Sequence, residues 1–199
     1  MRTARPVWAL VHAGEPRPGG QLAVSQTALC FEDEETGIIV LYLASDRPGG
    51  PVGSLPGSTH IYVSTLGDDG TFGPAVLVPE LSSQYDEAGT AIRRDGLEIF
   101  VSSSRPGTGI PNSIWVSTRD STLDAWSTPV DLGSTVNSPG HGNVHPTLSW
   151  DGRALYFCSN RPGGFNAPAN SHITGDLYVT TRRKLRERER QDDSDHQRR

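Results

Sequence analysis

The sequence has few cysteines and no long apolar segment. Only two cysteines occur among 199 residues, Cys30 and Cys158, and they form no Cys-x-x-Cys pair, so we expect two small buried residues and no zinc or dithiol chemistry. No stretch approaches the roughly 18 apolar residues of a membrane-spanning helix. The apolar run at residues 7–11 is also shorter than the about 7–15 residues of a signal peptide. We therefore expect no membrane insertion, and the location of the chain stays open.

Basic residues are scarce outside the C-terminal segment. Residues 182–199 hold eight Lys or Arg and five Asp or Glu, whereas residues 1–181 hold ten basic and eighteen acidic side chains. Such an acidic body repels phosphate backbones, so nucleic acid is not an expected partner. The C-terminal segment alternates in charge and has one apolar residue, Leu185, which predicts a charged, disordered or helical tail over 182–199.

A repeated phrase organises the rest of the chain. The composition, with 22 Gly and 15 Pro, favours many short strands joined by turns. Three copies of an Arg-Pro-Gly phrase follow apolar runs, and their arginines are 58 and 56 residues apart. The copies read VLYLASDRPGG at 40–50, EIFVSSSRPG at 98–107 and ALYFCSNRPGG at 154–164, and each precedes a second run, IYVST at 61–65, IWVST at 114–118 and LYVTT at 177–181.

The turn chemistry predicts how the strands of one copy are joined. Asp-Gly pairs before the second and third copies are strong hairpin signals. In the Arg-Pro-Gly phrase, Pro fixes φ and Gly supplies the positive φ of a type II turn, while the preceding Ser can bind the turn backbone. Because these residues recur at the same place in every copy, we assign them a structural role: Asp46, Arg47, Pro48 and Gly49; Arg105, Pro106 and Gly107; Asn160, Arg161, Pro162 and Gly163.

These signals predict an all-β fold of three four-stranded antiparallel meanders. Their strands are apolar on both faces, as expected when each sheet lies between two similar sheets in a β-propeller. We predict blades at about 27–83, 84–138 and 139–181, forming an arc or part of a larger propeller. Residues 1–26 are expected to be irregular or a decayed partial blade.

Residues 27–183 resemble the TolB-like, WD-repeat-like propeller repeat of bacterial proteins. The third copy carries the fullest match, with Ser149, Asp151-Gly152, the run 155–157 and the phrase 159–164. The resemblance implies binding of ligands or proteins, often outside the cytoplasm, and supplies no catalytic residue. Three copies are fewer than the roughly four to eight blades of a closed ring. We interpret the chain as an N-terminally truncated member, with self-association through exposed blade faces as a second hypothesis.

Candidate binding residues are those that differ between copies near the start of the first strand. They are Glu87, Asn143 and His145, which we expect at the mouth of the central channel. His141 and His145 lack a third ligand, so no metal is predicted, and no cofactor motif is present.

The predicted function is binding or scaffolding without catalysis, with an unidentified protein, peptide or glycan as partner. No catalytic residue and no nucleophile elbow is recognisable, so we expect the chain not to be an enzyme. The alternative is a fragment of a propeller-type carbohydrate-active or peptidase-associated enzyme, because one fold supports many functions.

Overall fold

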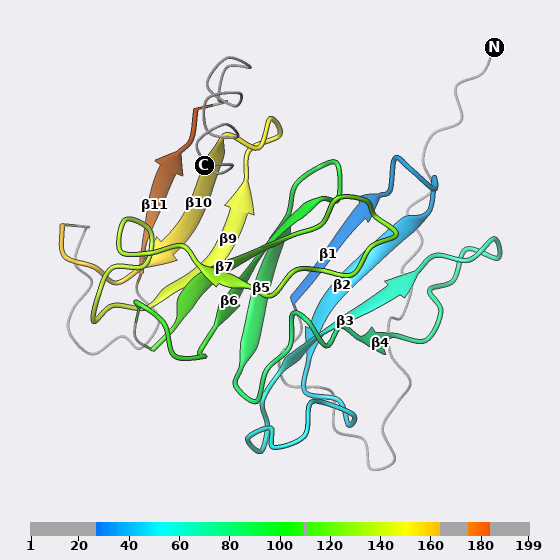
Figure 1. Cartoon of the computed structure of the whole chain (residues 1–199), viewed down its shortest axis with the longest axis horizontal. Coiled ribbons are helices and arrows are strands. Elements are labelled where there is room, and N and C mark those ends of the chain that lie inside the picture. The colour runs from blue at the N-terminus through cyan, green and yellow to red at the C-terminus, as the bar shows by residue number, and fades with distance from the viewer. Residues whose placement is uncertain (1–26, 110, 164–174, 184–199) are drawn as a thin grey trace, which may run out of the picture.

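The computed structural model describes residues 27–109, 111–163 and 175–183, which form three antiparallel sheets lying side by side (Figure 1). We call them blade 1 (β1–β4), blade 2 (β5–β8) and blade 3 (β9–β11). The all-β fold class with propeller blades is confirmed. The predictions for residues 1–26 and for most of the tail at 182–199 lie outside the described residues.

Each blade is a meander whose strands follow one another in sequence. Blade 1 contains β1 (Thr27–Glu32), β2 (Ile39–Ser45), β3 (His60–Thr65) and β4 (Val76–Leu77). Blade 2 contains β5 (Glu87–Ile92), β6 (Glu98–Ser103), β7 (Ser113–Thr118) and β8 (Val130–Asp131). Blade 3 contains β9 (Asn143–Leu148), β10 (Ala154–Ser159) and β11 (Asp176–Thr181).

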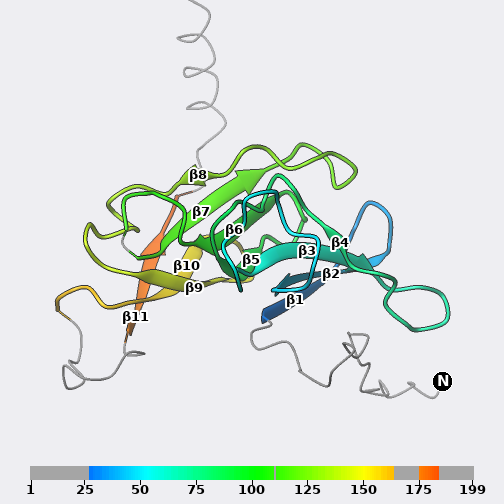
Figure 2. The same cartoon turned by 90° about the horizontal axis from the view of Figure 1, so that it is seen from below.

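The first strands of the three blades are neighbours, since β5 contacts both β1 and β9. Figure 2 shows the same row of sheets from below. Within the described residues, blade 3 has three strands where four were expected. The fourth strands of the other blades, β4 and β8, are only two residues long, because Pro74 and Pro129 lie just before them and cannot donate to a ladder.

Glycines at the hairpin turns have the backbone geometry that the sequence predicts. Gly96 and Gly152 of the Asp-Gly pairs have φ of 70° and 67°, and Gly49 and Gly163 of the Pro-Gly turns have φ of 103° and 101°. Gly107 differs, because its φ lies outside this left-handed region. A Cβ there would clash with the Asp131 carboxylate and lie 2.8 Å from the Trp115 ring, so close approach explains this glycine.

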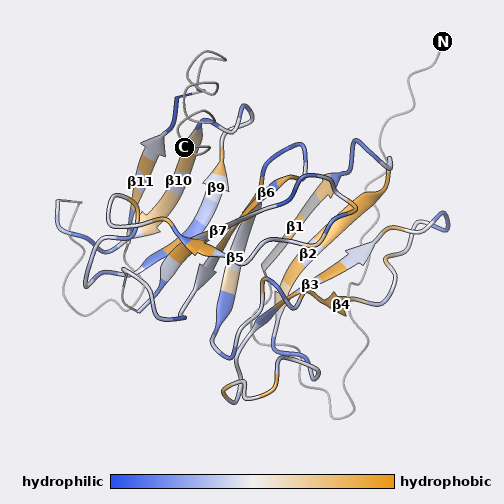
Figure 3. Cartoon of the chain, in the orientation of Figure 1, coloured by the Kyte–Doolittle hydropathy of each residue, from blue (hydrophilic) through white to orange (hydrophobic). Residues whose placement is uncertain are grey.

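Two hydrophobic cores lie between successive blades. The first joins Tyr42 and Ile61 of blade 1 to Ile99 and Trp126 of blade 2, and the Trp126 indole N–H donates to the Tyr42 hydroxyl at 3.1 Å. The second core contains Ala91, Phe100, Ile114, Val136, Leu155 and Phe157, all of them buried. In Figure 3 the hydrophobic colour is clear on β2, whereas several hairpin turns are hydrophilic.

Cys158 differs from the expectation of a small buried residue, whereas the expectation for Cys30 is not tested. Cys30 lies in β1, and its side chain is outside the described part of the structure. Cys158 is half-buried, because in β10 it alternates with the buried residues Leu155, Phe157 and Ser159, which point to the other face.

A second arginine repeat, missed by the sequence reading, follows the third strand of blades 2 and 3. Arg119 and Arg182 donate from Nε to the carbonyls of Gly96 and Gly152, each at 2.8 Å. Arg182 also forms a two-pronged ion pair with Glu98 at 2.7 and 2.6 Å, which ties the end of blade 3 to blade 2. Hydrogen bonding to Glu98 raises the pKa of Arg182.

Asp131 organises the loops at the outer edge of blade 2. Its carboxylate accepts from the backbone N–H groups of Thr108 and Gly133 at 2.8 and 2.6 Å, and from Asn137 Nδ2 at 3.0 Å. Burial alone would raise the pKa of Asp131, but these hydrogen bonds outweigh it and hold the pKa below its ordinary value of 3.8.

The lowered pKa of Asp131 predicts an acid-dependent loss of stability. A carboxyl whose folded pKa is depressed stabilises the fold above its unfolded pKa, and this contribution is lost as pH falls through the folded value. The free energy of unfolding should therefore decrease below the ordinary pKa of 3.8. Urea titrations at a series of pH values should show a shallower decrease for Asp131→Asn than for the wild-type chain. Parallel pH curves for the two proteins would contradict this account.

Candidate functional site

The repeated arginines are held by the serine two residues earlier. Arg105 donates from its backbone N–H and from Nε to Ser103 Oγ, at 3.1 and 3.0 Å. The Arg47–Ser45 and Arg161–Ser159 pairs repeat both bonds. Each guanidinium also lies over an aromatic ring, at 4.9 Å for Arg47 over Tyr62, 5.3 Å for Arg105 over Trp115 and 4.9 Å for Arg161 over Tyr178.

Arg105 and Arg161 connect successive blades through the segments that join them. Arg105 Nη2 donates to the carbonyl of Leu81, which lies between β4 and β5, at 2.9 Å. Arg161 Nη2 donates in the same way to the carbonyl of Val136, between β8 and β9. We call the first strand of each blade (β1, β5 or β9) its inner strand. Both guanidinium groups also bind the first residue of an inner strand: Arg105 binds Glu87 Oε1 at 3.0 Å, and Arg161 binds Asn143 Oδ1 at 2.8 Å.

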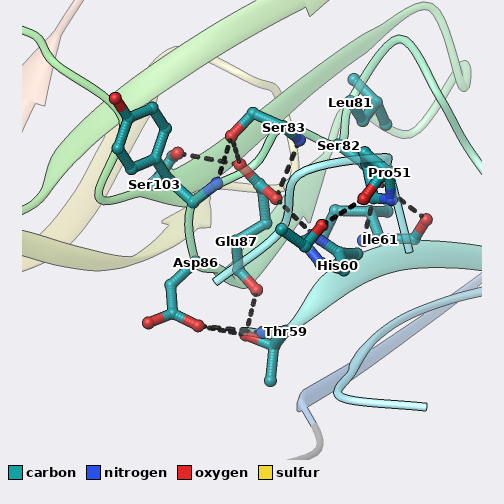
Figure 4. A network of polar contacts seen from close by, with 12 residues as sticks. Pro51, Thr59, His60, Ile61, Leu81, Ser82, Ser83, Asp86, Glu87 and Ser103 are labelled. Atoms are coloured by element: carbon teal, nitrogen blue, oxygen red, sulfur yellow. Dashed lines mark hydrogen bonds and ion pairs between the residues drawn. The ribbon is translucent and has the colours of Figure 1, made fainter. Parts of the chain in front are cut away.

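Glu87 is fully buried and is the centre of a polar network (Figure 4). Its Oε1 accepts from Ser83 Oγ at 2.5 Å, Ser103 Oγ at 3.1 Å and Arg105. Its Oε2 accepts from the backbone N–H of Ser83 and lies 3.1 Å from His60 Nδ1 of β3. The carboxylate thus joins blade 1 to blade 2, and its hydrogen bonds and ion pair with Arg105 compensate its burial.

Glu87 and Asn143 were predicted at a channel mouth, and the structure places both in the fully buried interior. Asn143 Nδ2 donates to the carbonyl of His141 at 2.9 Å, while its Oδ1 is bound by Arg161. The hydrogen-bonding atoms of both side chains contact the turn arginines and nearby groups of the protein. Glu87 is therefore a charged partner for Arg105, whereas Asn143 is a neutral partner for Arg161, the equivalent arginine of the next blade.

His145 has a different position from the other two predicted binding residues. It is exposed, lies on β9 where the register shifts opposite β10, and has a φ of 54°. Among the described residues it is the non-glycine residue with a positive φ, and it adjoins Gly89, where an added Cβ would lie 3.3 Å from His145 Nδ1. A strained bulge on a strand redirects a side chain, as happens next to binding sites.

A groove of about 430 Å³ crosses the three inner strands at the end opposite Glu87 and Asn143. Apolar side chains such as Phe31, Ile92 and Leu148 form part of its lining. Polar groups in the lining are Glu32, Glu34, Thr90, Arg94, Thr147 and Ser149, and Trp150 supplies an aromatic ring. An apolar surface with a few convergent polar groups is the usual composition of a small-molecule site.

Three side chains form a continuous row along this groove, which we call the turn row: Glu34, Arg94 and Trp150. Each is the second residue after its inner strand, in the turn that leads to the next strand. Arg94 Nε lies 3.2 Å from Glu34 Oε1, and the Arg94 guanidinium lies 4.4 Å from the centre of the Trp150 ring. Trp150 remains 79% exposed, so most of its surface is open to a ligand.

The turn row was missed because the sequence reading used these turns only as hairpin signals. The three residues share one position of the blade but differ in chemistry, as an acid, a base and an aromatic residue. That difference between copies was the criterion that selected Glu87, Asn143 and His145, and it was not applied to the Asp-Gly turns. Only the arrangement of the blades in space shows that these three turns lie side by side.

The described residues contain no group of three or more His, Cys, Asp or Glu side chains arranged to hold a metal ion. In the same part of the chain, no helix is long and apolar enough to span a bilayer.

Comparison with known proteins shows the fold. No family model and no curated protein matches the sequence. The structure is similar to the crystal structure of an α-L-arabinofuranosidase from Lactobacillus brevis, with a TM-score of 0.52 and 17% identity over 82% of this chain. The match covers 53% of the arabinofuranosidase, so this chain spans about half of its length. That protein has a propeller-type fold, whereas the TolB-like and WD-repeat-like resemblance stays a prediction.

The expectation that the chain is not an enzyme is contradicted, because the structural neighbour is an enzyme, a glycoside hydrolase. The expectation rested on the lack of a recognisable catalytic motif in the repeat, and such a lack does not exclude catalysis, because one fold supports many functions.

The buried network predicts a graded response to substitution of Glu87. Glu87→Ala leaves Arg105 without its carboxylate and should lower the free energy of unfolding by about 3–5 kcal/mol. Glu87→Gln should cost less, because an amide oxygen at Oε1 can still accept from Arg105, as Asn143 does for Arg161. Asn143→Ala is the matched neutral deletion and should cost about 1–3 kcal/mol. Denaturant unfolding followed by circular dichroism measures all three, and equal losses would contradict the assignment.

Proposed function

We propose that this chain is part of a carbohydrate-active propeller and that the groove along the turn row binds a sugar chain. The observation that carries the proposal is the turn row itself, which places a carboxylate, a guanidinium and an exposed indole on one groove. The propeller fold shared with a glycoside hydrolase supports this class of ligand.

The chemistry of the groove suits a neutral, hydroxyl-rich ligand. An indole presents an apolar face beside a polar N–H group, which matches the apolar and polar faces of a sugar ring. Carboxylates and guanidinium groups form strong charge-assisted hydrogen bonds to hydroxyls. Glu32 and Glu34 outnumber Arg94 in the lining, and this excess of negative charge disfavours phosphate or other anions.

The name of the structural neighbour gives a first ligand to test, an oligosaccharide that carries α-L-arabinofuranosyl groups. Glu32 and Glu34 are the carboxylates that line the groove, so they are the residues that could act as acid or base there. Glycosidases use a pair of carboxylic side chains on either side of the scissile bond. If the chain acts on its ligand, these two residues are the first candidates for substitution.

The sugar-binding proposal predicts a specific effect of Trp150→Ala. Removing the indole should weaken binding of arabino-oligosaccharides about 10-fold or more, corresponding to about 1.4 kcal/mol, as measured by isothermal titration calorimetry. Leu123→Ala is the matched control, because Leu123 is also 79% exposed but does not line the groove. Glu34→Gln should weaken binding as well. Undiminished binding by the Trp150 variant, or no binding by the wild-type chain to neutral glycans, would refute the proposal.

Hydrolysis is measured separately with a chromogenic α-L-arabinofuranoside. Turnover that disappears in Glu32→Gln or Glu34→Gln, and persists in Leu123→Ala, would assign the reaction to the groove. Turnover that survives both glutamate substitutions would place it elsewhere. Binding of an unfolded peptide in preference to any glycan would instead favour the peptide-binding function considered from the sequence.

A further inference from the structure

The indole ring of Trp126 is part of the packing between blades 1 and 2. It lies among apolar side chains of both blades, and its N–H donates to the Tyr42 hydroxyl at 3.1 Å. The Arg119 guanidinium lies over the ring, 4.2 Å from its centre. The first interface between blades therefore contains an aromatic ring with apolar surroundings, one hydrogen-bond acceptor and one cation on its face.

The second interface, between blades 2 and 3, contains a pocket of about 220 Å³, which we call the interface pocket. Its apolar lining consists of Phe100, Val116, Leu132, Val136, Leu148 and Leu155. Glu98 and Arg182 are among the polar residues of the lining. Protein interiors are normally close-packed, and an apolar cavity of about 150 Å³ is large enough to bind benzene. The interface pocket therefore has the size of a site for an aromatic compound.

The apolar lining of the interface pocket repeats the surroundings of Trp126 residue by residue. The two members of each pair hold the same place relative to the turn serine, in the strand register, or in the connection that a turn arginine binds. All six counterparts belong to the cluster that contains Trp126. The pairs are Phe100 with Tyr42, Val116 with Val63, Leu132 with Val78, Val136 with Leu81, Leu148 with Ile92 and Leu155 with Ile99.

The cation over the ring also has a counterpart, whereas the ring has none. Arg182 and Arg119 donate in the same way to the glycine carbonyl of their Asp-Gly turn, and Arg182 lines the interface pocket. Trp126 follows Arg119 by seven residues, but the residue seven positions after Arg182 is Glu189. Residues 182–199 contain no Phe, Tyr or Trp. The interface pocket thus has the surroundings of an indole ring, and the equivalent sequence position supplies no ring.

Two replacements define the chemistry of the ring that fits. Phe100 stands where Tyr42 stands in blade 1, so the hydroxyl that accepts from the Trp126 N–H is not repeated. A buried N–H group without an acceptor costs free energy, so a hydrocarbon ring fits better than indole. Glu98 stands where Val40 stands in blade 1, and its carboxylate is paired with Arg182 at 2.7 and 2.6 Å. This pairing compensates the charge of Glu98 beside an uncharged ring.

The burial of the lining distinguishes a free compound from a side chain of another polypeptide. Phe100, Val136 and Leu155 are only 4%, 7% and 6% exposed, so the opening of the interface pocket is narrow. A narrow opening admits a small planar molecule more readily than a ring that is attached to a peptide backbone.

We propose that the interface pocket binds a free, uncharged, planar aromatic compound of the size of an indole ring, with the Arg182 guanidinium against one face of the ring. The proposal does not depend on sugar binding, which concerns the groove along the turn row. The observation that carries it is the set of six paired positions around Trp126, together with the pair of Arg119 and Arg182.

NMR titration of the full chain with indene, a bicyclic hydrocarbon of the shape of indole, tests the proposal. The amide resonance of Val116 should shift with a dissociation constant below about 1 mM. The resonance of Val63, its counterpart beside Trp126, should not shift. Indole should bind more weakly than indene, and N-acetyltryptophanamide, which carries the indole on a peptide backbone, more weakly still. No saturable shift at Val116, or an equal shift at Val63, would overturn the proposal.

Two variants test the site in opposite directions. Val116→Phe fills part of the interface pocket and should weaken indene binding about 10-fold or more, whereas Val52→Phe places the same ring at a fully exposed position outside the lining and should leave binding unchanged. Phe100→Tyr restores the hydroxyl and should raise the affinity for indole relative to indene about 3-fold. Circular dichroism checks that each variant is folded. Unchanged indene binding by a folded Val116→Phe variant, or tighter binding of N-acetyltryptophanamide than of indene, would contradict a site for a free aromatic compound.

Discussion

The structure depends on the contacts that two turn arginines, Arg105 and Arg161, make with the connection that enters their blade. Arg105 and Arg161 bind a carbonyl of that connection and a buried polar side chain at the start of the inner strand. Sheets that meet only through apolar side chains would slide, because hydrophobic contact is not directional. A planar guanidinium with several donors fixes the spacing and rotation of successive sheets. The apolar cores then fill the space that these contacts define.

This contact explains which parts of the fold the sequence could predict. The Arg-Pro-Gly phrase and the Asp-Gly pairs are local signals, and they were sufficient to identify meanders and propeller blades. The blade-to-blade partners were not predictable in the same way, because Arg105 reaches Leu81 and Glu87 across 24 and 18 positions of sequence. The same is true of Arg182, whose partner Glu98 is 84 residues away. The conformation of a turn depends on adjacent residues, whereas packing partners depend on how the blades stack.

The candidate site shows a second limit of prediction from sequence alone. Glu87 and Asn143 were selected because they differ between copies and are polar, and these properties also suit a buried partner for arginine. Polarity in a repeat therefore did not distinguish a ligand site from an internal contact. Exposure did, since Trp150 is largely exposed while Glu87 is inaccessible. His145 is exposed and strained on the inner strand, a combination that no pattern of residue types encodes.

The position of the turn row has a consequence for how such proteins diversify. The second residue of each inner hairpin turn lies beyond the inner strand, outside the two cores between blades and outside the arginine contacts. When gene duplication copies a whole blade, the new blade therefore adds one more such turn position, outside the packed cores, at the same rim of the molecule. Mutation there can change the recognition surface in single steps while the framework is inherited intact. A ring of repeats thus offers a combinatorial set of side chains, one contributed by each unit, from which new specificities can arise.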